Sequence, residues 1–275
     1  MPKFSRTRIL LAKHGFLSKK SIGKLIKPLA SDALSKLAAT EHLAVGFSRV
    51  LKHDVRRPIT ELRGHISTLE RRGGEPKKIF RAIENAGFLS TYTKRIIERH
   101  KKGIEFLPAV ISFSNLAASI KRLVEINSSA EFGKAVTFSS NINFRNRNTK
   151  IFADDIGLLR VATNLLTNAF DAMEYGKELR MLGVVGVNLR LEGNGLHLTV
   201  SDNGRGMTAE QLRKVRQKLT EDTSFTSKTG NRGIGLNNVR EIVKAHRGRL
   251  SVKSELGKGT EFDVEIPVKG KAKAQ

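Results

Sequence analysis

The sequence has no cysteine among its 275 residues. This absence excludes disulfides, thiol nucleophiles and cysteine-ligated zinc, and nothing else in the composition indicates an extracellular protein. Long apolar runs are also lacking, since none approaches the roughly 18–20 residues that span a bilayer. The sequence therefore predicts a cytoplasmic protein.

Acidic residues are scarce beside basic ones: 26 Asp and Glu stand against 50 Lys and Arg, which gives a formal net charge of +24. This excess predicts an acidic partner such as nucleic acid, an anionic membrane surface or an acidic pocket of another protein. Charge alone does not choose between them. The hydrophobic fraction of 39% permits a packed core, and the length fits one large or two ordinary domains.

Residues 1–39 form a basic arm with no acidic residue before Asp32. Such a composition is typical of a partly disordered, solvated tail. It is equally compatible with an amphipathic arm that contacts an anionic membrane or nucleic acid, and with an organelle transit peptide. The sequence leaves these alternatives open.

Residues 40–103 carry the pattern of two helices joined by a short loop. Apolar residues recur at spacings of four and three over Val55–Leu69, and Gly73–Pro76 then breaks the pattern. A second periodic run covers Ile79–Ile97. Two such helices bury little surface alone, so we expect an antiparallel hairpin that a second copy completes into a dimeric four-helix bundle.

His53 lies just before the first apolar stripe, and Asp54 follows it. The position of His53 relative to the stripe predicts that it points out of the bundle, and Pro58 predicts a kink in the helix just after it. An exposed imidazole beside a carboxylate can be held in the tautomer that attacks an electrophile. Most single histidines are surface or packing residues, so the local sequence alone makes His53 a weak candidate for a nucleophile.

Residues 104–268 alternate short strands with helices, which predicts an α/β sandwich with a mixed sheet on one side and helices on the other. A polar stretch at 219–232 predicts a mobile lid, and residues 269–275 read as a polar tail. The predicted helices are 114–126, with Ser114 as its N-cap, then 155–175, 209–218 and 235–246. The predicted strands are 106–113, 135–138, 150–152, 184–190, 196–200, 250–254 and 261–267.

Two glycine-rich turns are the strongest local signals. A predicted strand leads into Asp202, Gly204 and Gly206, and a second turn, Gly233–Leu236, opens a helix. Glycine lets the backbone approach a phosphate closely, and a helix N-terminus offers unpaired N–H groups and a positive dipole end. Two such turns at this separation predict one phosphate-binding site.

Asn164 and Asn168 lie four residues apart, on one face of the helix predicted for 155–175. Asparagine is unfavourable inside helices, so two on one face require an explanation. An amide oxygen is a hard ligand that suits Mg²⁺, which also takes phosphate oxygens and water. Hydrogen bonds to neighbouring loops explain the pair equally well.

These stretches, in this order and spacing, resemble the motifs of the GHKL ATPases, and in particular those of the sensor histidine kinases of two-component systems. The resemblance covers about residues 40–268. The matching stretches are Lys52–Thr60 as the phosphoacceptor box, with Asp54 in the usual Glu place, Asn164–Ala169 as the N box, Asp202–Met207 and Gly230–Leu236 as the two glycine boxes, and His246–Leu250, Ser254–Phe262 and Ile266–Pro267 as the C-terminal signature.

The resemblance implies an α+β protein: a dimerisation and histidine-phosphotransfer hairpin at residues 40–103, then a GHKL (Bergerat) α/β sandwich at residues 104–268 that binds ATP and Mg²⁺. It implies an ATP-dependent protein-histidine kinase that acts as a homodimer. Such a kinase autophosphorylates His53 and passes the phosphoryl group to an aspartate of a response-regulator receiver domain. Receivers present an acidic pocket, which suits a basic kinase surface.

The family's site roles are carried over residue by residue. His53 corresponds to the phosphoacceptor and Asp54 to the group that orients or deprotonates it. Asp202 corresponds to the acceptor of the adenine amino group, and Asn168 to the Mg²⁺ ligand. The residues that the resemblance places around ATP are Asn164, Asn168, Asp202, Gly204, Gly206, Lys228, Gly233, Ile234, Gly235, Leu236 and Thr260.

The sequence also departs from the family pattern. Arg57 stands where the family often has a Thr or Asn that is linked to dephosphorylation of the regulator, so phosphatase activity is not implied. Asn231 replaces a glycine that the family often has in the second glycine box. The two alternative predictions are that the chain is a non-catalytic phosphotransfer or adaptor protein that keeps the fold, or a GHKL ATPase that acts on nucleic acid. The intact glycine boxes argue against the first. Asn164, where water-activating ATPases have Glu, argues against the second.

Overall fold

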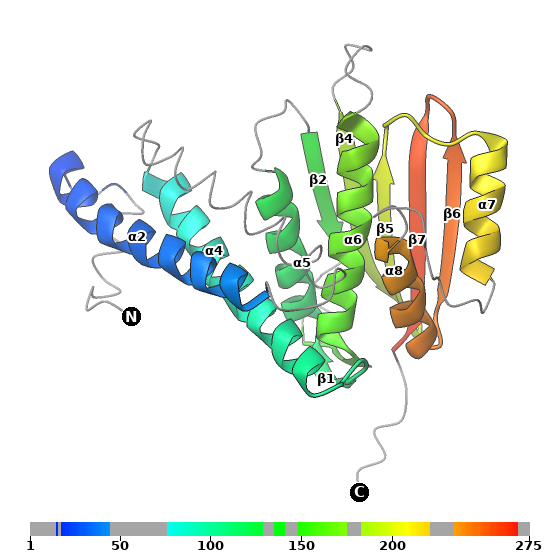
Figure 1. Cartoon of the computed structure of the whole chain (residues 1–275), viewed down its shortest axis with the longest axis horizontal. Helices are drawn as coiled ribbons and strands as arrows, with labels where there is room; N and C mark the ends of the chain where they lie inside the picture. Colours follow the sequence, from blue (N-terminus) through cyan, green and yellow to red (C-terminus); the bar gives the residue numbers. More distant parts are fainter. Residues whose placement is uncertain are drawn as a thin grey trace, which may run out of the picture. The chain divides into compact units, whose positions relative to one another are not determined.

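The chain divides into two compact units, Met1–Gly103 and Ile104–Gln275, which we call the helical unit and the sandwich unit. Figure 1 shows the elements of a computed structural model. The predicted site residue His53 and the apolar stripe that follows it lie outside the described residues. The structure describes residues 15, 18–44, 76–128, 135–140, 148–174, 183–220 and 234–268.

The helical unit contains α2 (Lys19–Ala44) and α4 (Pro76–Lys101), which pack against each other. α4 covers the second helix of the predicted hairpin. Its apolar face is buried. Its last turn is basic, and these positive charges interact favourably with the negative end of the helix dipole. The buried apolar side chains of α4 are Ile79, Phe80, Ala82, Ala86, Leu89, Tyr92, Ile96 and Ile97.

α2 covers part of the basic arm at residues 1–39, for which the sequence left a disordered tail, an amphipathic arm and a transit peptide open. Leu25, Ala30 and Ala33 are buried in this helix. Lysines separate the apolar residues here, so the charge pattern concealed a helix with a packed face. Pro28 lies inside α2 and removes one backbone hydrogen bond from it.

The sandwich unit is built on a five-stranded sheet in the order β2-β4-β5-β7-β6. β2 (Ala135–Ser140) is parallel to β4 (Val184–Glu192). β5 (Gly195–Asp202), β7 (Gly259–Pro267) and β6 (Arg249–Glu255) continue the sheet with antiparallel pairings. The sheet is therefore mixed, as predicted.

Three helices cover one face of this sheet: α5 (Phe113–Ser128), α6 (Asp155–Glu174) and α8 (Ile234–Ala245) (Figure 1). α6 packs against α5, α8 and β5, and so occupies the middle of the helical layer. The predicted α/β sandwich is confirmed. The largest fully buried side chains of this unit are Phe113, Ile120, Leu123, Ile126, Ile156, Leu158 and Leu165.

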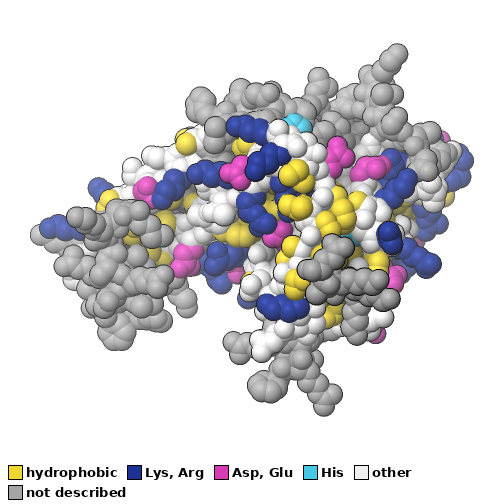
Figure 2. Space-filling view, turned by 90° about the horizontal axis from the view of Figure 1, so that it is seen from below, with side chains coloured by type: hydrophobic (Ala, Val, Ile, Leu, Met, Phe, Trp, Pro, Cys, Tyr) yellow, Lys and Arg dark blue, Asp and Glu magenta, His cyan; other side chains and the backbone are white. Residues whose placement is uncertain are grey.

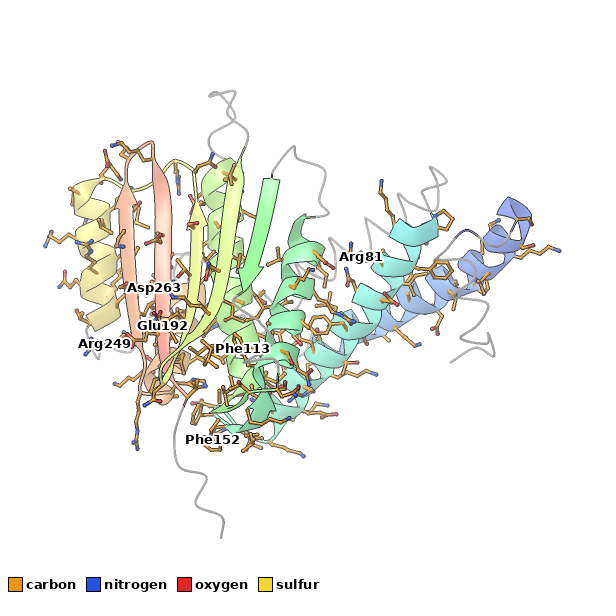
Figure 3. The ribbon with its side chains drawn as sticks, turned by 180° about the vertical axis from the view of Figure 1, so that it is seen from behind. Arg81, Phe113, Phe152, Glu192, Arg249 and Asp263 are labelled. Carbon is orange, nitrogen blue, oxygen red and sulfur yellow. The ribbon has the colours of Figure 1, made fainter. Side chains whose placement is uncertain are left out.

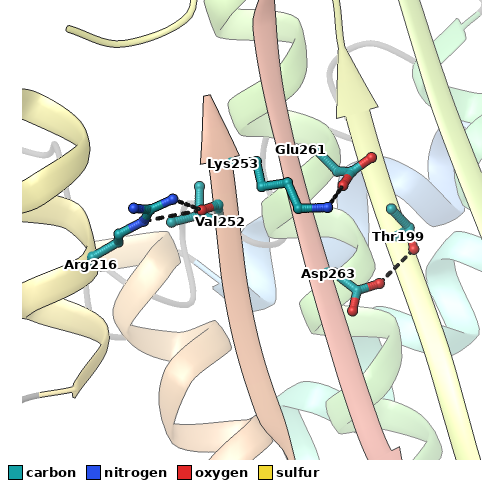
Figure 4. A network of polar contacts seen from close by, with 6 residues as sticks. All are labelled: Thr199, Arg216, Val252, Lys253, Glu261 and Asp263. Atoms are coloured by element: carbon teal, nitrogen blue, oxygen red, sulfur yellow. Dashed lines mark hydrogen bonds and ion pairs between the residues drawn. The ribbon is translucent and has the colours of Figure 1, made fainter. Parts of the chain in front are cut away.

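The other face of the sheet is polar, as Figure 3 shows from behind with Glu192, Arg249 and Asp263 labelled. Residues alternate along each strand, because successive side chains point to opposite faces. The hydroxyl of Thr199 donates to Asp263 at 2.7 Å across neighbouring strands (Figure 4). Cross-strand polar pairs such as this one link neighbouring strands on this face.

Helix α7 (Ala209–Thr220) packs against β6. It has no buried residue. The Arg216 side chain donates from Nε and Nη2 to the carbonyl of Val252, at 3.3 and 3.1 Å (Figure 4). A polar clasp to the backbone of β6 is therefore a main attachment of this helix.

A second, two-stranded sheet pairs β1 (Ala109–Ser112) with β3 (Lys150–Ala153) in antiparallel fashion. Helix α5 begins at Phe113, so the residue before it is Ser112, whose hydroxyl lies 2.8 Å from that of Ser114. The predicted N-cap Ser114 was therefore wrong, because the strand ends one residue earlier than its apolar pattern and the helix follows at once.

Apolar side chains remain exposed near this small sheet. Phe152 is labelled in Figure 3, and Figure 2 shows hydrophobic side chains at the surface between Lys and Arg. Within the ranges that the structure describes, no helix combines the length and apolar character that a membrane crossing requires. The exposed large apolar residues of the β1–β3 region are Phe106, Leu107, Val110 and Phe152.

Candidate functional site

Helix α6 carries three positions of the site at intervals of about one turn. Asn164, Asn168 and Ala172 are spaced by four residues, so they share one face, each about 6 Å along the axis from the next. Asn164 is 1% exposed, whereas Asn168 is half-buried. Helix α6 therefore sets the spacing between the other parts of the site.

Asn164 lies against the N-terminus of α8. Its Nδ2 donates to the carbonyl of Arg160 at 2.8 Å, and its buried Oδ1 has no hydrogen-bond partner. A Cβ at Gly235 would come within 2.6 Å of that Oδ1, so the close approach requires glycine. An unsatisfied buried acceptor costs about 1–3 kcal/mol, which indicates a position prepared for a metal ion, a water molecule or a ligand donor.

Asp202 is the last residue of β5 and pairs with Thr260 of β7. Its Oδ1 accepts the Gly204 N–H at 2.8 Å. Burial raises the pKa of the Asp202 carboxyl to about 6, although hydrogen bonds from the backbone of Gly204 and Thr260 act in the opposite direction. At neutral pH the group is an ionised, poorly solvated acceptor, which suits a ligand that brings an amino donor.

The loop Asn203–Gly206 sits over the C-terminal part of α6. The Arg205 N–H donates to the carbonyl of Ala172 at 3.2 Å. A Cβ at Gly204 would come within 2.8 Å of the same carbonyl oxygen. The loop after Asp202 is thus fixed about one turn beyond Asn168.

Gly206 and Thr260 lie where this loop meets the turn between β6 and β7. Gly206 has a φ of 63°, and a Cβ there would overlap the carbonyl of Glu255, so glycine is required by both conformation and space. Thr260 is buried, and its hydroxyl lies 3.0 Å from that of Ser254. Both residues therefore shape the Asp202 end of the site.

The opposite end of the site is the N-terminus of α8, where Ile234, Gly235 and Leu236 form the first turn. The first N–H groups of a helix have no partner within it, and the dipole favours an anion there. No acidic residue occupies this turn. The predicted site residues Lys228 and Gly233 fall outside the described part of the chain.

The described residues thus bring together an acceptor at one end, amides in the middle and an anion-binding helix end. This order fits a ligand with an amino-bearing base at one end and phosphates at the other. In the described ranges no three His, Asp or Glu side chains gather as a metal cluster. A cation here would take its protein ligands from the amide oxygens of Asn164 and Asn168, and the rest from phosphate and water, which is chemistry that Mg²⁺ accepts.

The sequence did not predict two hydrogen bonds that support the loops of the site. The Asn203 Oδ1 accepts the Val184 N–H at 2.7 Å, which closes the base of the loop. Its place in an Asp-Asn-Gly turn is a usable signal, because Asn side chains in turns often bond nearby backbone. The Ser254 hydroxyl donates to the carbonyl of Gly259 at 2.8 Å across a hairpin, and no local sequence pattern predicts that hydrogen bond.

Comparisons with known proteins cover the part of the chain that contains the described site. Residues 153–270 match the model of a family described as histidine kinase-, DNA gyrase B- and HSP90-like ATPase, and this interval contains every predicted ATP-site residue. The chain is 29% identical to sensor histidine kinase ZraS of Escherichia coli K12, over 85% of this chain and 46% of that protein. It is 25% identical to sporulation kinase B of Bacillus subtilis, over 78% of this chain and 47% of that protein. The resemblance to sensor histidine kinases is confirmed.

The chain spans about half the length of these curated relatives. Among solved structures, it is similar to the histidine kinase domain of the Erythrobacter litoralis blue-light activated histidine kinase. The TM-score is 0.43 at 18% identity, and the match covers 87% of this chain and 94% of that domain.

Proposed function

We propose that the chain is an ATP-dependent histidine kinase, because residues 153–270 match the model of the histidine kinase-, DNA gyrase B- and HSP90-like ATPase family. The observation that carries the proposal is the buried, unpartnered Oδ1 of Asn164 against the start of α8. A phosphate-binding site that recruits a cation would satisfy this acceptor.

At the base end, Asp202 accepts a hydrogen bond from the adenine amino group. A guanine base presents a carbonyl oxygen at the same position, and two acceptors facing each other are unfavourable. Thr260 and the loop of Gly204 and Gly206 shape the rest of the adenine pocket. The site therefore selects ATP over GTP.

At the phosphate end, the backbone N–H groups of Ile234, Gly235 and Leu236 donate to phosphate oxygens. The resemblance also assigns Gly233 to the phosphate end and Lys228 to offsetting the charge of the terminal phosphate. Asn168 would hold Mg²⁺, with Asn164 beside it, and the ion would supply charge neutralisation for the phosphates.

The phosphoacceptor is His53. A ring nitrogen forms a bond to the γ-phosphorus while the bond between that phosphorus and the β–γ bridging oxygen breaks, and ADP leaves. Asp54 accepts the proton from the other ring nitrogen or holds the ring in the reactive tautomer. The phosphoryl group then passes to an aspartate carboxylate of a receiver domain.

We also propose the partners. The hairpin predicted at residues 40–103 dimerises through a four-helix bundle, since two helices alone bury too little apolar surface. The receiver domain of a response regulator accepts the phosphoryl group in the cytoplasm, where ATP is supplied. The domain bounds that accompany this proposal are residues 40–103 for phosphotransfer and 104–268 for catalysis.

The test is incubation of the full chain with γ-labelled ATP and Mg²⁺. Phosphohistidine is acid-labile and alkali-stable, so the label is identified by its stability. We expect label on the wild type and none on His53→Gln or on Asn168→Ala. ATP binding should survive in His53→Gln, because that residue is not part of the nucleotide site, and should fall in Asn168→Ala.

A matched control is His197→Gln, which changes a half-buried histidine on the polar face of the sheet. It should label like the wild type. Label that persists on His53→Gln would show that another residue is the phosphoacceptor. ATP binding with no label on the wild type would replace the kinase with a non-catalytic adaptor.

A further inference from the structure

Residues 104–108, which we call the connector, open the sandwich unit and contact the rest of it through Leu107 and Phe106. The Leu107 N–H donates to Oδ2 of Asp154 at 3.2 Å. The Phe106 ring meets the imidazole of His246 edge-on, with ring centroids 4.8 Å apart. Both contacts lead from an exposed segment to a buried polar residue.

Asp154 is 1% exposed and stands immediately before α6. Its Oδ1 accepts the Gly157 N–H at 3.1 Å, which caps the first turn of the helix. Its own N–H donates to Nε2 of His246 at 3.0 Å. One buried carboxylate residue therefore joins the connector, the start of α6 and His246.

His246 follows the last residue of α8 and is buried. Its Nδ1 lies 2.7 Å from the carbonyl of Ile242, which can only accept, so Nδ1 carries the proton and Nε2 accepts the Asp154 N–H. Burial lowers the pKa of His246, while the Ile242 carbonyl and the Asp154 carboxylate raise it. Lys244 and Arg247, the charged residues beside it in the chain, are exposed. Protonation of Nε2 would remove the acceptor and break the bond to Asp154.

Helices α6 and α8 run antiparallel and approach closely at two points. Near Asp154, a Cβ on Gly157 would come within 3.1 Å of the Ile242 side chain. At the other point, a Cβ on Gly235 would come within 2.6 Å of Asn164 Oδ1. About two turns of each helix, roughly 10 Å, separate the two points. Because packed interiors transmit displacement, a shift at the first point changes the spacing at the second.

We propose that Asp154 and His246 form a latch that ties the connector to α6 and α8, and that both are positioning residues for the nucleotide site. With the latch closed, Asn164 is held against the start of α8. When the connector is released, the two helices shift and nucleotide binding weakens. The positioning role rests on the proposed function of the site, whereas the latch itself does not.

The test uses the full chain with His246→Phe and His246→Gln. Phenylalanine keeps a ring beside Phe106 but accepts no hydrogen bond from Asp154. Glutamine places an acceptor near the position of Nε2 and does not titrate. The readouts are the hydrogen-exchange protection of the Leu107 amide and the affinity for a fluorescent ATP analogue.

We expect His246→Phe to lower Leu107 protection by about tenfold and nucleotide affinity by about three- to tenfold. His246→Gln should keep both close to wild type. On acidification to about pH 5, Leu107 should lose protection in the wild type but not in His246→Gln. This comparison uses exchange alone, because protonation of Asp202 affects nucleotide binding in the same range. Phe106→Ala, which leaves the buried pair intact, should lower Leu107 protection by about threefold.

His197→Gln is the matched control and should leave every readout unchanged. The sheet amides of Val187 and Val200 should keep their protection in all variants. Loss there together with Leu107 would indicate general unfolding and overturn the latch, as would full Leu107 protection in His246→Phe. Loss of Leu107 protection with unchanged nucleotide affinity would overturn the positioning role. A wild type that binds no ATP analogue, yet shows the expected exchange, would remove the proposed function and leave the latch standing.

Discussion

At the scale of single residues, the poorly solvated carboxylate of Asp202 lowers the stability of the folded protein but suits the recognition of a ligand. Its pKa is about 6 in the folded protein against an ordinary 3.8, so the folded state binds this proton more tightly than the unfolded chain. The contribution of this group to the free energy of unfolding is therefore most favourable below about pH 4, falls as the pH rises to about 6, and is constant above that. We expect Asp202→Asn to raise the free energy of unfolding by on the order of 2 kcal/mol at neutral pH.

The measurement is urea unfolding of both proteins from about pH 4 to about pH 8 without nucleotide. The gain should shrink toward acid pH, while ATP affinity of the variant falls by about tenfold or more. Glu265→Gln, an exposed change on β7, should shift stability by less than about 0.5 kcal/mol. A gain of the same size at every pH would contradict burial of an ionised carboxylate as its cause.

Arg247 is the only residue other than glycine with a positive φ, 56°, in the described part of the chain. It follows His246, and the Gly248 N–H donates to the Val243 carbonyl at 2.9 Å, as in a Schellman helix end. Glycine is the favoured residue at this position. Arg247→Gly should therefore raise the free energy of unfolding by about 0.5–1 kcal/mol in urea unfolding.

The matched control for this change is Arg249→Gly, which removes an exposed arginine from β6 two residues later. Strand interiors are weakened by glycine, so this variant should lose about 0.5–1 kcal/mol. Equal losses in both variants would mean that contacts of the Arg247 side chain outweigh the strain of its backbone.

At the scale of elements, α7 is the helix most open to local unfolding. It has no buried residue, and Arg216 ties it to the carbonyl of Val252. We expect Arg216→Ala to speed hydrogen exchange of the α7 amides by about fivefold or more, with little change in Tm, since the sheet core does not depend on α7. Lys214→Ala is the control, because it removes an exposed lysine that pairs with Glu210 of the same helix. Equal effects of the two changes would rule out the clasp.

The sequence predicted the helices that have a regular apolar face, and it left undecided a helix whose apolar residues are separated by charged ones. The predicted bounds of α6 and α8 agree with the structure to within one residue, because their apolar periodicity is regular. The sequence left the first part of α2 undecided, because lysines interrupt its buried residues. The motif residues Asp202 and Asn164 could be named in advance. The unpartnered Oδ1 of Asn164 depends on how α6 meets α8, which no local pattern specifies.

The latch is a sharper case of the same limit. Asp154 and His246 are 92 residues apart in the chain, and each has an ordinary local role, one before a helix and one after. Only the antiparallel pairing of α6 and α8 brings them together. Long-range polar pairs of this kind carry no periodic signal, so the sequence alone does not predict that Asp154 and His246 meet.

At the scale of the whole molecule, positive charge is concentrated on the helical unit. Residues 1–103 contain 24 Lys and Arg against 8 Asp and Glu, whereas residues 104–275 contain 26 against 18. The nucleotide site needs only local donors, so most of the excess charge is not explained by ATP binding. An acidic partner that docks on the helical unit would explain it.

This division predicts that residues 104–275 bind ATP without the helical unit. Every described site residue belongs to this unit, which has its own sheet and its own buried core. We expect its Kd for a fluorescent ATP analogue to lie within about threefold of the full chain, with a weaker dependence on salt because its net charge is smaller. Asn168→Ala in the isolated unit should abolish this binding. If the isolated unit folds, as judged by cooperative unfolding, but binds no nucleotide while the full chain does, then residues of the helical unit complete the site.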